Sequence, residues 1–153
     1  AERHPGMWPA DARARAFARS MCAEMHAGFR HLRNDMTMCI RERVDVRPWS
    51  PDLTRDIERA FALWSEARRR FGAGGPYLFG AWSIADAFFA PVAFRFQTYA
   101  VEPPEEAGAY WRRLLAHPHV REWEGAAQAE TAVIEVDEPR HIYRDKLRSQ
   151  GRP

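Results

Sequence analysis

Apolar side chains recur three or four positions apart in the first part of the chain, which is typical of one face of a helix. Asp11, after Trp8 and Pro9, stands where an acidic side chain favours a helix start. Gly28 interrupts the pattern, and we interpret it as a point where another helix or a ligand approaches closely. The apolar positions are Ala14, Phe17, Ala18, Met21, Met25, Phe29, Leu32 and Met36.

A second helix is predicted from Ser50, a favourable N-cap residue, and Pro51, which suits the first helical position. Acidic residues near its start and arginines near its end both complement the helix dipole. The glycine-rich stretch 72–76 ends this helix. It lacks the lysine and hydroxyl residue of a phosphate-binding loop.

The third long helix is expected to be the most buried element. Residues 84–100 are apolar on almost every side, apart from Arg95, and a helix without a polar face belongs inside a domain. Ser83 and Asp86 are spaced as a structural capping box, in which each side chain can reach the other residue's backbone N–H. Pro91 is expected to bend the helix.

Two shorter helices are predicted after this one, separated by a break at residues 117–119. The pattern weakens from Thr131 onward. We therefore predict an all-α fold, a bundle of five or more helices around a central buried helix. Residues 1–9 are expected to be a linker from a missing N-terminal domain, residues 10–130 the helical domain, and residues 131–153 a C-terminal tail.

Composition excludes several classes of protein. The chain has 153 residues and a net charge of +2, and its 21 acidic residues are spread among 23 basic ones, which argues against nucleic-acid binding. No apolar run approaches the roughly 18 residues of a membrane span. Cys22 and Cys39 form neither a CxxC pair nor a zinc pattern, so we expect no metal and a reduced, cytoplasmic protein.

Two segments resemble the C-terminal domain of glutathione S-transferases. Residues 80–87 (GAWSIADA) resemble the capped start of the buried helix in that family, which implies a folding role for Ser83 and Asp86. Residues 24–32 (EMHAGFRHL) are similar to the first helix of this domain in bacterial, beta-like members. There the histidine faces the cleft between domains, a role that the resemblance carries to His26.

Several residues are candidates for binding glutathione or its acceptor substrate. His26 could hydrogen-bond glutathione or its thiolate, although a lone histidine near an apolar face is more often structural. Arg33 could contact a glutathione carboxylate or simply be solvated at the surface. Arg95, inside a buried helix, needs a partner and belongs either to a structural ion pair or to the cleft. Met25, Phe89 and Tyr99 could line an apolar pocket or belong to the core.

The resemblance implies a domain that supplies the hydrophobic acceptor wall for conjugation of glutathione, the co-substrate, to small hydrophobic electrophiles. It also implies a homodimer and a thioredoxin-like domain before Ala1 that holds the catalytic residue, so no catalytic residue is assigned here. The chain alone is expected to be inactive. The alternative is a non-catalytic transferase-like scaffold or binding module.

Overall fold

The architecture is entirely helical, as predicted. The computed structural model describes residues 6–149 and 151, and within them the residues outside helices form only two isolated β-bridges, near residues 77–81. The elements are α1 (Ala12–Ala27), α2 (Arg30–Asp35), α3 (Pro51–Phe71), η1 (Gly72–Gly74), α4 (Ile84–Thr98), α5 (Glu105–Leu115), α6 (Pro118–Ala129), η2 (Glu135–Asp137), α7 (Pro139–Ile142) and α8 (Arg144–Ser149). In this part of the chain, no helix is long and apolar enough to cross a membrane.

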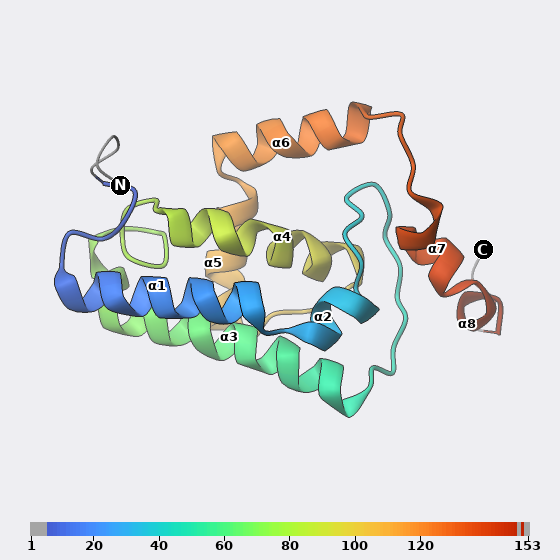
Figure 1. Cartoon of the computed structure of the whole chain (residues 1–153), viewed down its shortest axis with the longest axis horizontal. Coiled ribbons are helices and arrows are strands. Elements are labelled where there is room, and N and C mark those ends of the chain that lie inside the picture. The colour runs from blue at the N-terminus through green and yellow to red at the C-terminus, as the bar shows by residue number, and fades with distance from the viewer. Residues whose placement is uncertain (1–5, 150, 152–153) are drawn as a thin grey trace.

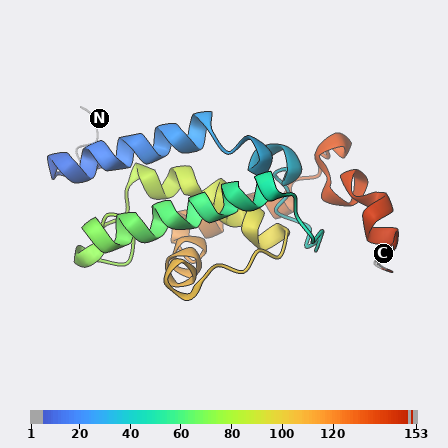
Figure 2. The ribbon, with the colours of Figure 1, turned by 90° about the horizontal axis from the view of Figure 1, so that it is seen from below.

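Helix α4 is the centre of the bundle. It packs against α1 and α5, while α3 contacts α1, α2 and α5 (Figures 1 and 2). Nine of the fifteen residues of α4 are buried, more than in any other helix described. The prediction that this apolar helix is the most buried one is therefore confirmed.

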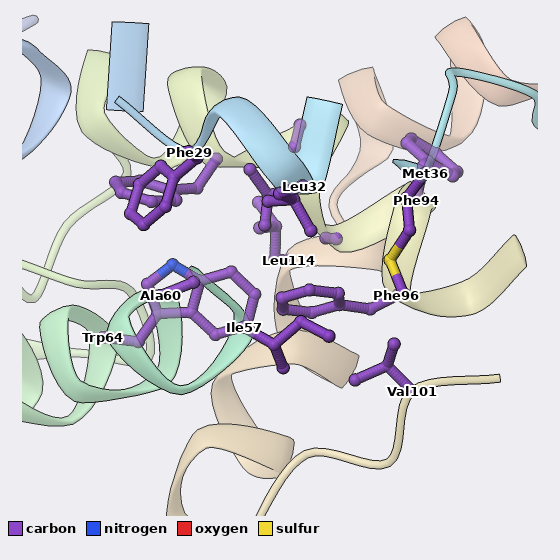
Figure 3. Packing of buried hydrophobic residues seen from close by; sticks show 14 of the residues in the cluster. Phe29, Leu32, Met36, Ile57, Ala60, Trp64, Phe94, Phe96, Val101 and Leu114 are labelled. Carbon is purple, nitrogen blue, oxygen red and sulfur yellow. The ribbon is translucent and has the colours of Figure 1, made fainter. Parts of the chain in front are cut away.

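An aromatic cluster joins α3 to α4 and α5. The Trp64 ring on α3 contacts Phe89 and Phe96 of α4 at centroid distances of 5.9 and 5.5 Å, and Tyr110 of α5 at 5.1 Å. Figure 3 shows Trp64 and Phe96 within the surrounding aliphatic side chains. All four aromatic side chains are buried. Their edge-on contacts add to the free energy gained from burying the rings.

The start of α4 is held by one buried carboxylate. Asp86 accepts hydrogen bonds from the backbone N–H of Ser83 at 2.8 Å and of Leu78 at 3.1 Å. It also accepts from the hydroxyls of Ser83 and Tyr110. Ser83 and Asp86 thus have the capping-box arrangement. Burial raises the pKa of Asp86, and these hydrogen bonds oppose that rise.

The first apolar stripe forms two helices, not one. Helix α1 ends at Ala27, Gly28 is its C-cap, and Phe29 adopts a left-handed conformation with φ of 52° before α2 begins. A Cβ atom on Gly28 would lie 2.7 Å from the carbonyl oxygen of Glu24. The close approach at Gly28 therefore comes from its own helix and not from another helix, while the alternative of a ligand stays a prediction.

The C-terminal segment packs against residues 35–48. Tyr143 donates its hydroxyl to the backbone carbonyl of Asp35, and Lys146 donates to that of Pro48 at 2.9 Å. Thr37 donates to the carbonyl of Asp137, and Leu147 is buried. The segment that follows α6 therefore covers the irregular chain between α2 and α3.

Candidate functional site

His26 stands at the edge of an apolar hollow. It lies in the last turn of α1 and its side chain is exposed. The hollow has a volume of about 350 Å³. Its lining comprises Trp8, Arg19, Cys22, Ala23, His26 and Phe88. An exposed imidazole beside apolar walls can donate or accept a hydrogen bond without the cost of full burial.

Of the six residues in this lining, the sequence predicted only His26 as a candidate for binding. Trp8 was placed in a linker, Phe88 was not separated from the core residues of the third helix, and Arg19 was not considered. In the structure, the leader packs back on the domain, because the Ile84 N–H donates to the carbonyl of Met7 at 2.8 Å. The Arg19 guanidinium then lies over the Trp8 ring, 5.6 Å from its centroid. An isolated tryptophan before a helix cap was the available indication that the leader is attached.

Arg33 is held beside the end of α1. Its Nη1 donates to the backbone carbonyl of His26 at 2.6 Å, which satisfies one of the free carbonyls at a helix C-terminus. The rest of the Arg33 side chain is exposed. The structure therefore places Arg33 next to the His26 backbone but not in the lining of the hollow.

Arg95 is held by backbone oxygens instead of an ion pair. Its Nε donates to the carbonyl of Met36 at 2.7 Å, and its Nη1 lies 3.3 Å from the Pro91 carbonyl. Among residues 6–149 and 151, no carboxylate lies within 4.0 Å of this guanidinium. Burial, and then the positive charge of Arg33, lower the pKa of Arg95. The positive charge of Arg95 is thus uncompensated by any neighbouring carboxylate.

The structure does not bring the remaining candidates to the hollow. Phe89 and Tyr99 are fully buried, the first against Trp64 and the second hydrogen-bonded to the Thr37 hydroxyl at 2.9 Å. Met25 is partly buried and packs on the core. Within this fold Phe89 and Tyr99 act as core side chains and support α4 from inside.

A larger hollow borders the same pair of residues. Its volume is about 780 Å³, and it shares Trp8 and Arg19 with the hollow at His26. The Phe71, Phe79 and Trp82 rings form its aromatic walls. Apolar surface therefore continues from His26 along α1 to the N-terminal end of that helix.

The thiols are unsuited to nucleophilic chemistry. Burial raises the pKa of Cys22 to about 12, and burial also raises the pKa of Cys39. Both thiols stay protonated at neutral pH, and a protonated thiol is a poor nucleophile. No group of three or more His, Cys, Asp or Glu side chains that could hold a metal ion is present in residues 6–149 and 151.

Comparison with known proteins identifies the family. No curated protein matches the chain. The profile of the family described as glutathione S-transferase, C-terminal domain, matches residues 47–126. The match runs from just before α3 into α6 and includes the capped start of α4. It begins after α1 and therefore does not include His26. Because the match spans more than half of the chain, the protein belongs to the family of glutathione S-transferase C-terminal domains.

Proposed function

We propose that this chain is the helical part of a bacterial, beta-like glutathione transferase and forms the wall on which a small hydrophobic electrophile binds. The observation that carries the proposal is the exposed imidazole of His26 beside the apolar Trp8 and Phe88. A scaffold would not need this combination of an apolar hollow and a hydrogen-bonding group. The proposal includes a homodimer in the cytoplasm.

The chain and its expected partner domain divide the chemistry. Conjugation needs a glutathione thiolate held against an apolar acceptor. In this proposal the thioredoxin-like domain lowers the thiol pKa, His26 hydrogen-bonds the bound glutathione, and the hollow holds the acceptor. Arg33 lies beside the His26 backbone and supplies positive charge for a glutathione carboxylate.

The first test uses the chain itself. Residues 1–153 should not conjugate glutathione to an aromatic chloride, because the residue that activates the thiol is expected in the thioredoxin-like domain. In a ¹⁵N NMR titration, S-hexylglutathione should shift the Trp8 indole and the amides around His26. Glutathione without the hexyl group should shift them much less. Equal shifts with both ligands, or none, would contradict an apolar acceptor site.

The second test uses the intact transferase. His26→Ala should lower kcat/KM about tenfold, which corresponds to roughly 1.4 kcal/mol of transition-state stabilisation, with little change in Tm. His31→Ala is the matched control, because His31 faces Asp35 and Asp52 and does not line the hollow. A large fall in Tm, or unchanged kinetics, would return His26 to a structural role. Intact protein without transferase activity would favour the scaffold.

A further inference from the structure

Exposed apolar side chains are concentrated in the C-terminal part of the molecule. Six large hydrophobic side chains are exposed among the described residues, and Met7 is the one that precedes α6. The other five are Trp123 (46% exposed), Val133 (54%), Ile134 (64%), Val136 (71%) and Ile142 (40%). Such a concentration on a soluble domain marks a binding surface more often than chance exposure.

Part of this surface is hollowed. A cavity of about 250 Å³ lies between α6, residues 38–41 and the segment that leads to α7, and we refer to it as the tail hollow. The volume suits one bulky side chain better than a whole drug-sized ligand. Its apolar lining comprises Met38, Cys39, Ile40, Trp123, Ala127, Ala132 and Ile134.

The rim of the tail hollow is acidic. Glu130, Asp137 and Glu138 line it, and Arg41 is the one basic residue of the lining. Arg41 is already engaged, because it donates to the carbonyl of Glu130 at 2.9 Å and lies 3.5 Å from the Glu138 carboxylate. Within the described part of the chain, Glu130 and Asp137 have no cation within 4.0 Å. The rim therefore presents carboxylates that a cationic partner can neutralise.

The surface is held in shape before any partner binds. The Trp123 ring lies edge-on to the buried Phe94, with centroids 5.4 Å apart. Arg41 ties down the chain at Glu130, and Thr37 ties it down at Asp137. A preformed surface loses less conformational entropy on binding, which favours recognition of a short segment.

We propose that the tail hollow binds a peptide segment of another protein that inserts a bulky apolar side chain and carries arginine or lysine on either side of it. The apolar lining accounts for the inserted side chain. The uncompensated Glu130 and Asp137 account for the flanking cations. This proposal does not depend on the transferase proposal, because the tail hollow shares no residue with the hollow at His26.

The experiment first selects a peptide ligand and then substitutes residues of the tail hollow. A random heptapeptide library is panned on immobilised chain, and the enriched peptide is measured by fluorescence anisotropy. We expect enriched peptides that combine Arg or Lys with Trp, Phe or Leu. Ile134→Ser should weaken binding about tenfold or more, as for a central contact of an interface. Val133→Ser is the matched control, since Val133 is exposed but does not line the tail hollow, and it should change Kd less than about twofold.

Charge is tested in the same assay. Glu130→Gln should weaken binding severalfold, whereas Glu105→Gln, at the distant start of α5, should not. No enriched peptide, acidic consensus peptides, or equal binding to wild type and Ile134→Ser would overturn the proposal. Sedimentation that shows a dimer lost in Ile134→Ser would also overturn it, because a second copy would then occupy the tail hollow.

Discussion

The centre of the bundle and the C-terminal segment are held by different kinds of contact. Around α4, fully buried rings such as Trp64 and Phe96 pack on one another. Hydrogen bonds add to this packing at both ends of the helix, at Asp86 and at Arg95. The segment after α6 is attached mainly through side chains that donate to backbone carbonyls, as Tyr143 and Lys146 do. Its main buried apolar side chain is Leu147.

This difference indicates which region sets the global free energy of unfolding and which region can open locally. Burial of apolar area is the dominant favourable term in folding, so the centre should set the global free energy of unfolding. Hydrogen bonds exchanged with water contribute about 1 kcal/mol each at most sites. The C-terminal segment should therefore open locally at a lower cost than the whole domain.

The largest expected effect comes from the centre. Trp64→Ala should lower the free energy of unfolding by about 4 kcal/mol, since it empties a fully buried site surrounded by aromatic rings. Trp64→Phe should cost clearly less, because a ring remains and the indole N–H, which has no hydrogen-bond partner among the described residues, is removed. Urea unfolding measures both. Equal losses in the two variants would contradict packing as the cause.

The second-largest loss of unfolding free energy is expected at the buried cap of α4. Asp86→Ala should cost about 3 kcal/mol, because the N–H groups of Leu78 and Ser83 and the Tyr110 hydroxyl lose their acceptor inside the protein. Ser83→Ala, which removes one hydroxyl at the N-cap, should cost about 1 kcal/mol. Unchanged urea midpoints in both variants would mean that the capping box does not stabilise the domain.

The C-terminal segment should respond in a different observable. Leu147→Ala should cost about 2 kcal/mol locally, at the low end for a buried leucine, because the segment can relax on the surface. Hydrogen exchange should speed up at α7 and α8, while amides of α4 keep their protection. Exchange that rises equally in α4 would show that the segment is part of the central cooperative unit.

The sequence was informative where local chemistry decides the structure. The capped start at Ser83, the proline start at Pro51 and the apolar α4 were all predicted from short-range patterns. The end of a helix at Gly28 was not predicted, because apolar residues recur at helical spacing on both sides of this glycine. Helix α2 is instead pinned from a distance, where Asp56 of α3 accepts from the Leu32 N–H at 2.9 Å. Periodicity carries no information on such a contact.

The candidate site was also predicted only where a local motif indicates it. His26 was identified from a local motif and is exposed beside a hollow, although its role in binding stays a prediction. Phe89 and Tyr99 were predicted either to line an apolar pocket or to belong to the core, and helical spacing alone does not distinguish the two. Trp8 was missed because its contact with Arg19 joins the leader to α1. The sequence did not predict residues such as Trp8 that long-range packing brings to the site.

The smallest expected effect is ionic and lies on the outside of the centre, where α1 meets α3. The Glu24 carboxylate accepts two hydrogen bonds from the Arg59 guanidinium, at 2.6 and 2.8 Å. These bonds lower the pKa of Glu24 below its usual 4.5. A lowered pKa in the folded state means that the stabilisation is complete above the unfolded value and is lost as pH falls through the folded one.

Glu24→Gln should therefore cost about 0.5 kcal/mol near neutral pH, a value reduced by solvent because the pair is partly exposed, and less near pH 3. Urea unfolding at the two pH values measures the difference. Glu58→Gln is the matched control, because it removes an exposed carboxylate from the same helix as Arg59 and leaves the pair of Glu24 and Arg59 intact. A cost that persists in acid would mean that Glu24 acts through packing. In that case the hydrocarbon part of the Glu24 side chain, not its charge, would stabilise the contact between α1 and α3. Apolar burial alone would then account for the difference in stability between the centre and the C-terminal segment.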